Sequence, residues 1–411
     1  MKVGLQSLPY GLRLLLATLS LGIGAGLVGI ACHYLLEGVQ SLAFGQASSN
    51  LLQLFQEAGN LRRFLVLCVT GCLAAGFWYV LQRRYKLLSI RKQIDLVGNT
   101  DPVPLPHLLH AVMQIVIVGA GASVGKEGAP REVGALLAGH LSKGFSLALK
   151  ERKVLVACGA GAGLAAVYQV PFASSLFVFE TLGLAYSWQN FLLVLASTYL
   201  ATWVAQPVVG QDAIYHLPAV SWSVSGFLQA ILIALLVTPL ALVFRSLAKQ
   251  ANCKRRKDET ILWALPLAFL VLGGLVSFFP IFMGNGQVLA QALLSHQPVP
   301  CLPLALVMKG LLVYLLLRNG AYGGTLTPSF ALGIGSGYLV TLLLTVVGVH
   351  LNPALGMLLG ATVFLGTTLH APLTAIALSL GFTGQDWSLT IPLVLAAGMS
   401  YVIRKRWERG Q

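Results

Sequence analysis

A glycine-rich segment at residues 119–134 carries the strongest chemical signal in the sequence, because it combines glycines with a single helix start and acidic side chains. It reads Gly119-Ala-Gly-Ala-Ser-Val-Gly-Lys-Glu-Gly-Ala-Pro-Arg-Glu-Val-Gly134. Glycines beside a helix start let backbone N–H groups converge on a ligand, and the positive end of the helix favours an anion. We therefore interpret the carboxylate of Glu127 as a tethered competitor of a bound anion, which leaves when it is protonated or displaced.

A second segment offers a matching half of the site. It reads Gly320-Ala-Tyr-Gly-Gly-Thr-Leu-Thr-Pro328 and presents the backbone N–H groups of Thr325 and Leu326 ahead of a helix that Pro328 can start. Two helix N-termini with one acidic gate describe a site for a small anion, since positive helix ends do not hold a cation. The pattern does not say which anion.

Two other interpretations of the first segment were weighed. A nucleotide-binding P-loop is excluded, because Ala120 and Glu127 occupy positions that need glycine and a hydroxyl residue. A structural ion pair of Glu127 with Lys126 or Arg131 is the remaining alternative. Ionisable residues inside a membrane are functional by default, which favours the gate.

Histidines and cysteines provide no second site in the sequence. His107, His110, His140 and His370 show no ligand spacing with carboxylates and are interpreted as loop or packing residues. Six scattered cysteines are interpreted as small packing residues: Cys32, Cys68, Cys72, Cys158, Cys253 and Cys301. No metal site and no cofactor are predicted.

The composition shows what must position these residues. Of 411 residues, 56% are hydrophobic and only 10% are charged, whereas soluble chains carry about a quarter charged residues. A polytopic membrane protein is predicted. The net charge of +14 does not indicate a nucleic-acid partner, because the basic residues lie in short clusters between apolar runs.

Long uncharged stretches predict an all-α fold, since an apolar stretch of about 20 residues is the length of one transmembrane helix. Five stretches can each span at least once: Leu14–Leu36, Phe64–Gln82, Val154–Phe179, Thr181–Gln211 and Ala213–Phe244. Two others, Thr260–Met308 and Asn319–Gln385, are too long for one helix and must fold back inside the membrane.

Basic clusters set the expected orientation. They occur at Arg83–Lys92, Lys143–Lys153, Arg245–Lys257 and Arg404–Arg409, and the positive-inside rule places all four in the cytoplasm. The segment Gln206–Ser223, with Asp212 and no basic residue, is expected on the opposite side. We expect a multi-pass protein of the inner membrane with both termini cytoplasmic and no soluble domain.

An internal repeat relates the two glycine segments. At nearly one offset, Gly121, Ala122, Gly125 and Gly134 recur as Gly320, Ala321, Gly324 and Gly333, and Gly159, Ala160, Pro171 and Gly183 recur as Gly360, Ala361, Pro372 and Gly384. The predicted halves are residues 1–210 and 211–411, and such repeats place a substrate site near the midplane. Isolated glycines such as Gly22, Gly24 and Gly26 are assigned to helix packing, whereas the matched clusters are interpreted as helix breaks at the site.

Four motifs in this order resemble the CLC family of chloride channels and proton/chloride exchangers. They are Gly125-Lys-Glu-Gly128, Gly323-Gly-Thr-Leu-Thr-Pro328, Tyr168-Gln-Val-Pro-Phe-Ala-Ser-Ser-Leu-Phe-Val-Phe-Glu180 and Thr367-Thr-Leu-His-Ala-Pro-Leu-Thr-Ala375. The resemblance implies an inverted repeat of tilted and broken transmembrane helices, and a homodimer with one pore per subunit.

The resemblance also implies residue roles. Glu127 corresponds to the gating glutamate that carries the exchanged proton. The backbone segments that correspond to anion-coordinating positions are Gly125, Lys126, Glu127 and Gly128, together with Thr325 and Leu326. The implied partners are chloride or a similar small anion, protons in the exchanger form, and the lipid bilayer.

Three departures from the family pattern concern the inner half of the pathway. The Gly-Ser-Gly-Ile-Pro signature is missing, and Ser89 is a weak substitute for its serine. Thr181 occupies the position of the inner glutamate that carries the proton in the family. A threonine hydroxyl group does not ionise at neutral pH and so cannot take up and release a proton in this way. Tyr401 lies about three helical turns too early for the inner-gate tyrosine. Glu180 is assigned a structural role at the end of its helix.

Transport of chloride or a similar monovalent anion, as a channel or as a proton antiporter, is therefore the leading hypothesis, and no enzymatic activity is expected. A fluoride-selective transporter with the same fold is the alternative. A hydrolase that uses Ser123 or Ser174 is disfavoured, since no Gly-x-Ser-x-Gly elbow is present.

Overall fold

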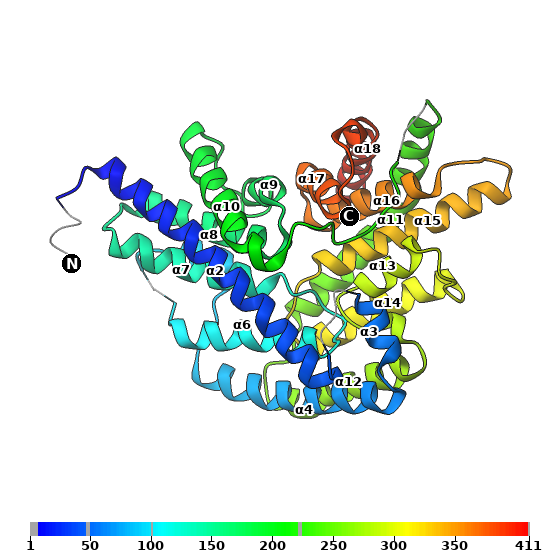
Figure 1. Ribbon diagram of the computed structural model, residues 1–411, viewed down its shortest axis with the longest axis horizontal. Coiled ribbons are helices and arrows are strands. Elements are labelled where there is room, and N and C mark those ends of the chain that lie inside the picture. The colour runs from blue at the N-terminus through cyan, green and yellow to red at the C-terminus, as the bar shows by residue number, and fades with distance from the viewer. Residues whose placement is uncertain (1–6, 47–49, 100–101, 221–223, 410–411) are drawn as a thin grey trace. The chain divides into compact units, whose positions relative to one another are not determined.

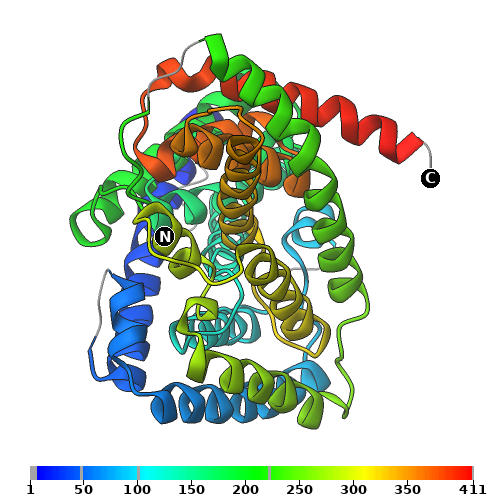
Figure 2. The same cartoon turned by 90° about the vertical axis from the view of Figure 1, so that its right-hand side faces the viewer.

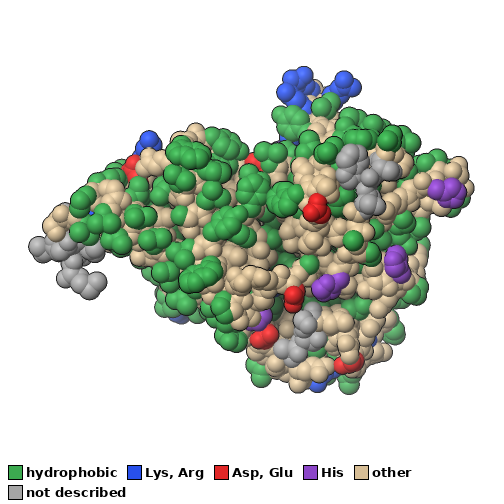
Figure 3. Space-filling view, turned by 45° about the horizontal axis from the view of Figure 1, so that its top comes forward, with side chains coloured by type: hydrophobic (Ala, Val, Ile, Leu, Met, Phe, Trp, Pro, Cys, Tyr) green, Lys and Arg blue, Asp and Glu red, His purple; other side chains and the backbone are tan. Residues whose placement is uncertain are grey.

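The protein is built from helices throughout the part that the structure describes. This computed structural model describes residues 7–46, 50–99, 102–220 and 224–409, which contain no sheet and one isolated β-bridge. Within these ranges seven helical segments are long and apolar enough to cross a membrane. Apolar side chains cover much of the face in Figure 3, where charged side chains are few and scattered. The prediction of an all-α polytopic membrane protein is confirmed.

The chain divides into two compact units. Unit 1 contains residues 1–36, 81–115 and 127–212, and unit 2 contains residues 37–80, 116–126 and 213–411. The units are interleaved in the sequence, so they are not the predicted halves 1–210 and 211–411. Whether those halves form an inverted repeat stays a prediction.

The helices of unit 1, some of which continue into unit 2, are labelled in Figure 1. They are α2 (Tyr10–Phe44), α5 (Ile90–Asp95), α6 (Pro104–Gly119), α7 (Gly128–Gly144), α8 (Leu149–Tyr168), α9 (Pro171–Glu180) and α10 (Trp188–Val209).

The helices of unit 2 include a long pair, α11 and α18, which lie side by side and are green and red in Figure 2. The set is α3 (Leu51–Glu57), α4 (Asn60–Arg84), α11 (Val224–Cys253), α12 (Ile261–Phe278), α13 (Gln287–Leu294), α14 (Leu302–Arg318), α15 (Leu326–Val346), α16 (Pro353–Leu369), α17 (Pro372–Thr383) and α18 (Thr390–Arg409), with short 3-10 turns at Pro280–Phe282 and Trp387–Leu389.

In unit 1, α7 and α8 cross backbone to backbone on glycines. A Cβ atom on Gly134 would lie 2.1 Å from the Gly159 carbonyl oxygen, and one on Gly163 would lie 2.1 Å from the Pro130 carbonyl oxygen. Neither position therefore has room for a side chain. Small residues permit this approach where dispersion between helices replaces the hydrophobic effect.

Unit 2 repeats the same crossing between α15 and α16. A Cβ atom on Gly360 would lie 2.3 Å from the Gly333 carbonyl oxygen, and one on Gly337 would lie 2.1 Å from the Gly356 carbonyl oxygen. Gly134, Gly159, Gly333 and Gly360 are the glycines matched in the sequence repeat. Their assignment to helix breaks was wrong, because all four lie inside helices and hold them together.

The packing role predicted for the isolated glycines is confirmed in unit 1. Added Cβ atoms on Gly22, Gly24 and Gly26 would lie within 3 Å of Leu200, Leu137 and Val204 respectively. Because glycine has no side chain, these three positions let α2 lie close to its neighbouring helices.

Matched helix breaks follow the crossing helices. Helix α8 ends at Tyr168, its C-cap residue Gln169 adopts the left-handed region (φ 55°), and α9 starts at Pro171. Helix α16 ends at Leu369, its C-cap residue His370 is also left-handed (φ 60°), and α17 starts at Pro372. A left-handed residue stops a helix and a proline suits the first turn of the next. The stretches Thr260–Met308 and Asn319–Gln385 are broken into several helices, as predicted.

The cysteines are less buried than predicted. Cys158 is buried and Cys32 and Cys68 are partly buried, whereas Cys72, Cys253 and Cys301 are exposed. The packing assignment was therefore wrong for the three exposed residues. The error arose because an apolar run in a membrane protein has faces that contact lipid as well as faces that pack.

Candidate functional site

The first glycine segment is an irregular connection between two helices. Helix α6 ends at Gly119, Gly121 adopts a positive φ of 96°, and α7 begins at Gly128 with Glu127 as its N-cap residue. The first N–H groups of any helix lack partners within the helix. The segment therefore aims backbone donors of residues 126–128 at whatever lies ahead of α7.

The second segment has the same form in unit 2. Helix α14 ends at Arg318, Gly320 has a φ of 120°, and α15 begins at Leu326 with Thr325 as its N-cap residue. Pro328 lies within the first turn, where its missing N–H costs no intrahelical bond. Leu326 is 2% exposed, so the donors at this helix start are buried.

The two segments are joined by a reciprocal pair of backbone hydrogen bonds in unit 2. Gly125 N donates to Gly324 O and Gly324 N donates to Gly125 O, each at 2.8 Å. A Cβ atom on Gly323 would lie 2.6 Å from Val124, so glycine is required for this approach. The N–H of Gly125 is used in this pair, and the donors left to an anion follow it in the chain.

The carboxyl group of Glu127 is enclosed in unit 1. The residue is 0% exposed, and its Oε2 accepts a hydrogen bond of 3.3 Å from the Tyr168 hydroxyl group. Its backbone oxygen accepts a hydrogen bond of 2.7 Å from Arg131 Nε. The guanidinium group of Arg131 also lies 5.3 Å from the centre of the Phe177 ring. Arg131 thus binds the backbone at the helix start and places a positive charge beside it.

This geometry combines broken helices, paired glycine segments and a buried glutamate at a helix start. A sequence model described as voltage gated chloride channel matches residues 95–405, about three quarters of the chain. The chain belongs to the voltage-gated chloride channel family. It is therefore a member of a family of membrane transport proteins.

Curated relatives of this chloride channel family member cover almost its whole length. It is 27% identical over 412 residues to the voltage-gated ClC-type chloride channel ClcB of Escherichia coli (strain SMS-3-5 / SECEC), with 97% of this chain and 96% of the relative covered. The ClcB protein of Escherichia coli O17:K52:H18 (strain UMN026 / ExPEC) is 28% identical with the same coverage.

Solved structures of the family share its fold. A slow cyanobacterial Cl⁻/H⁺ antiporter matches with a TM-score of 0.82 at 21% identity, covering 96% of this chain and 95% of that one. A CLC-type fluoride/proton antiporter matches with a TM-score of 0.76 at 22% identity and the same coverage. The predicted CLC-like architecture is confirmed.

The residues that depart from the family pattern have local structural roles. Ser89 caps α5, since its Oγ accepts a hydrogen bond of 3.4 Å from Lys92 N. Thr181 is the C-cap residue of α9, and its N–H donates to the Phe177 oxygen at 2.9 Å. Each of these contacts involves only the residue's own helix, so neither of them points to an anion or a proton.

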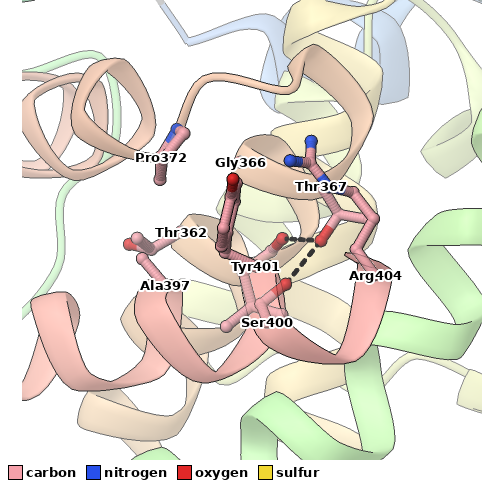
Figure 4. Close-up of a pocket in the computed structure, with 9 residues that line it drawn as sticks. Thr362, Gly366, Thr367, Pro372, Ala397, Ser400, Tyr401 and Arg404 are labelled. Carbon is pink, nitrogen blue, oxygen red and sulfur yellow. Dashed lines mark hydrogen bonds between the residues drawn. The ribbon is translucent and has the colours of Figure 1, made fainter. Parts of the chain in front are cut away.

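Tyr401 lies on α18 and lines a small cavity in unit 2, between α16 and α18. The cavity has a volume of about 10 Å³, and Thr367 and Ser400 face one another beside it with a hydrogen bond of 2.7 Å (Figure 4). The guanidinium group of Arg404 stacks on Tyr401 at 4.9 Å. The space is that of about one water molecule.

A buried cation that the sequence analysis missed supports the first glycine segment. Lys309 on α14 is 0% exposed, and its Nζ donates to Phe282 O at 3.0 Å and Gly284 O at 2.7 Å. Gly284 N in turn donates to Gly121 O at 2.8 Å. The sequence contained a signal for this residue, because an isolated lysine in a long apolar run marks a functional position.

The interpretation of the histidines as loop or packing residues was wrong for His107 and His110, whereas His370 lies in the connection between α16 and α17. His107 and His110 both bind Glu132, with distances of 2.6 and 2.9 Å between Nδ1 and the carboxylate oxygens. His370 Nε2 lies 3.4 Å from Glu408 Oε1. These partners lie 22 or more residues away, so no local spacing rule reveals them. His140 Nδ1 bonds to the carbonyl oxygen of Leu136 on its own helix.

Proposed function

We propose that this protein carries chloride or a similar monovalent anion across the bacterial inner membrane. Its anion site is formed by backbone N–H groups of Lys126, Glu127 and Gly128 and of Thr325 and Leu326, while the predicted Gly125 instead pairs with Gly324 beside the site. The observation that carries the proposal is the reciprocal bonding of Gly125 and Gly324, which joins two glycine segments that each open a helix. Helix starts bind anions without a counter-charged side chain, so the anion is not trapped.

Glu127 acts as the gate of this site. Its ionised carboxylate occupies the position of an anion, and the Tyr168 hydroxyl group holds it there. Protonation removes the charge, and the neutral side chain no longer competes for N–H donors. Anion transport and proton binding are thereby linked at one residue, which suits an exchanger and also suits a channel opened by protons.

Flux measurements in liposomes test the proposal. Purified protein is reconstituted with internal chloride, and chloride efflux and external pH are recorded together. Uphill proton movement driven by the chloride gradient identifies an exchanger, and chloride efflux alone identifies a channel.

The variants Glu127→Gln and Glu127→Ala are expected to conduct chloride and to lose all proton movement and pH dependence. Asp212→Asn, in the exposed loop after α10, serves as the matched charge-removing control and is expected to behave as wild type. Proton movement that survives in Glu127→Gln contradicts the assignment of the gate, and wild-type vesicles without chloride flux contradict the function.

Fluoride is the alternative anion, and one of the structural neighbours is a fluoride/proton antiporter. The same vesicles loaded with equal chloride and fluoride discriminate the two. Faster fluoride efflux by an order of magnitude or more assigns the chain to a fluoride-selective function, with the site unchanged.

The assembly and orientation are proposed together with the function. We propose a homodimer with one pore in each subunit, in the inner membrane with both termini cytoplasmic, because the four basic clusters require one common side. Light scattering of the detergent-solubilised protein measures the mass of the complex. A mass of one chain contradicts the dimer.

A further inference from the structure

Four polar side chains form a buried cluster in unit 1. His107, His110 and Gln114 lie on one face of α6, and Glu132 reaches them from the second turn of α7. Their exposed fractions are 1%, 5%, 3% and 8%. Burying two imidazoles and a carboxylate inside an apolar helix pair is costly unless they are hydrogen-bonded, and ionisable residues inside a membrane are functional by default.

The hydrogen bonds assign a proton to His107. Its Nε2 accepts a bond of 3.4 Å from Leu88 N, so its Nδ1 carries the hydrogen that it donates to Glu132 Oε1 at 2.6 Å. A contact this short is typical of a charge-assisted bond. Glu132 Oε1 is therefore the acceptor of this bond.

His110 has two partners for one nitrogen. Its Nδ1 lies 2.9 Å from Glu132 Oε2 and 2.9 Å from Gln114 Nε2, and Gln114 Nε2 also lies 3.1 Å from Glu132 Oε2. When Nδ1 carries a hydrogen it donates to Glu132, and when it does not it accepts from Gln114. The same positions of the atoms thus suit His110 both with and without a hydrogen on Nδ1.

The cluster extends in two directions. Leu88, which donates to His107, belongs to the basic segment Arg83–Lys92 expected at the cytoplasmic surface. At the other end, Gln114 Oε1 lies against Gly128, where a Cβ atom would come within 2.3 Å of it. Gly128 directly follows Glu127, and Glu132 lies about 7.5 Å further along α7 than Glu127. The cluster therefore lies between the expected cytoplasmic loop and the gate.

The cluster is separate from the charged groups that surround Glu127. The charged or titratable groups that act on Glu132 are His107 and His110. Arg131, next to it in the chain, turns its guanidinium group to the Glu127 oxygen and to Phe177. On the side of α2, Cys32 packs with other side chains against an apolar cluster of Ala111, Ile115 and Ala129.

We propose that His107, His110 and Glu132 form a second proton-binding site, which loads from the cytoplasmic side and supplies Glu127. The inference rests on the proposed function in its exchanger form. A proton from cytoplasmic water binds an imidazole nitrogen or a carboxylate oxygen of the cluster. That N–H or O–H bond then breaks, and the proton ends on the Glu127 carboxylate, which becomes neutral and leaves the anion site. The cluster supplies the titratable group that Thr181 lacks.

The test compares chloride and proton flux in reconstituted vesicles of three variants. Glu132→Gln and the double change of His107→Gln with His110→Gln keep polar side chains of similar size but remove the titrating groups. His140→Gln is the matched control, because His140 lies on α7 outside the cluster and bonds to Leu136 O. We expect the two cluster variants to keep chloride flux while the ratio of protons to chloride falls at least tenfold, and the control to match wild type.

The other possible results of this experiment contradict either the second proton-binding site or the proposed function. Unchanged coupling in Glu132→Gln overturns the inference and leaves the proposed function intact. A cluster that only holds α6 to α7 would lower chloride and proton flux by the same factor in both variants, which also overturns it. Chloride flux without proton movement in the wild type excludes a proton path while anion transport stands, and absence of chloride flux in the wild type refutes the proposed function itself.

Discussion

At the scale of single residues, the environment of Glu127 is set by side chains far from it in the sequence. The hydroxyl group of Tyr168, the last residue of α8, donates a hydrogen bond of 3.3 Å to its carboxylate. Tyr168 belongs to a recognised motif, yet nothing in that motif assigns it to the gate. A donor to a carboxylate favours the ionised form and so favours the closed site.

Replacing Tyr168 with Phe removes this donor and keeps the ring. One hydrogen bond contributes about 1 kcal/mol, so chloride flux at neutral pH is expected to rise by about five-fold. The flux assay across a series of external pH values measures the effect, with Tyr186→Phe in the loop before α10 as the control. A Tyr168→Phe protein with wild-type flux at every pH contradicts the contact's role.

The buried amino group of Lys309 is linked through a loop to the first glycine segment. Its Nζ satisfies two carbonyl oxygens of the loop before α13, and that loop bonds to Gly121. Buried carbonyl groups need a hydrogen-bond donor, so the Lys309 amine holds this loop in place.

Changing Lys309 to Met is expected to leave both carbonyl groups without a donor and to destabilise the protein by about 2–4 kcal/mol. Thermal unfolding in detergent measures the loss. The control Leu311→Met lies on the same helix with 46% of its side chain exposed, and it is expected to change stability little. Equal melting temperatures for the two variants would show that Lys309 does not support the loop.

At the scale of elements, two glycine crossings hold the helices that carry the site. Helices α7 and α15 each begin at a glycine segment and each cross the next helix through paired glycines. The crossing fixes the axis of the helix, and the axis determines where its first N–H groups point. The matched glycines are therefore spaced for packing, and through packing they orient the site.

Gly134→Ala tests the crossing of α7 and α8. The added Cβ would meet a backbone oxygen at 2.1 Å, which no rotamer change relieves, so a loss of about 3 kcal/mol or more is expected. Gly144→Ala is the control on the same helix, because an added Cβ there meets nothing within 4 Å. Fluorescence-detected gel filtration after heating compares them, and a Gly134→Ala protein as heat-resistant as Gly144→Ala refutes the packing role.

At the scale of the whole molecule, the proposed orientation rests on the basic loops. The loop after α11 is held in shape by its own contacts: Arg255 stacks on Tyr322 at 3.9 Å, and Arg256 N donates to Arg318 O at 3.1 Å. Burial lowers the pKa of the Arg255 guanidinium below its usual value. Guanidinium groups of arginine are not deprotonated in proteins, so the loop keeps its charge at physiological pH.

The exposed Cys253 at the end of α11 reports this orientation directly. A membrane-impermeant maleimide is expected to label Cys253 only in inside-out vesicles, and Asp212→Cys only in intact spheroplasts. Mass spectrometry of the digested protein identifies the labelled residue. Labelling of Cys253 from outside the cell reverses the proposed topology.

The class of fold was determined by the sequence alone, because a bilayer restricts uncharged stretches to helices and basic loops to one side. The two glycine segments and Glu127 were also visible, since helix breaks and an intramembrane carboxylate are local features of the chain. What only the tertiary structure decided is which distant side chains meet. Glu132 finds His107 and His110, Lys309 finds two carbonyl groups, and the repeat-matched glycines find each other across a helix crossing. Such contacts depend on how helices that are far apart in the sequence pack together. The spacing of residues along one helix does not predict them.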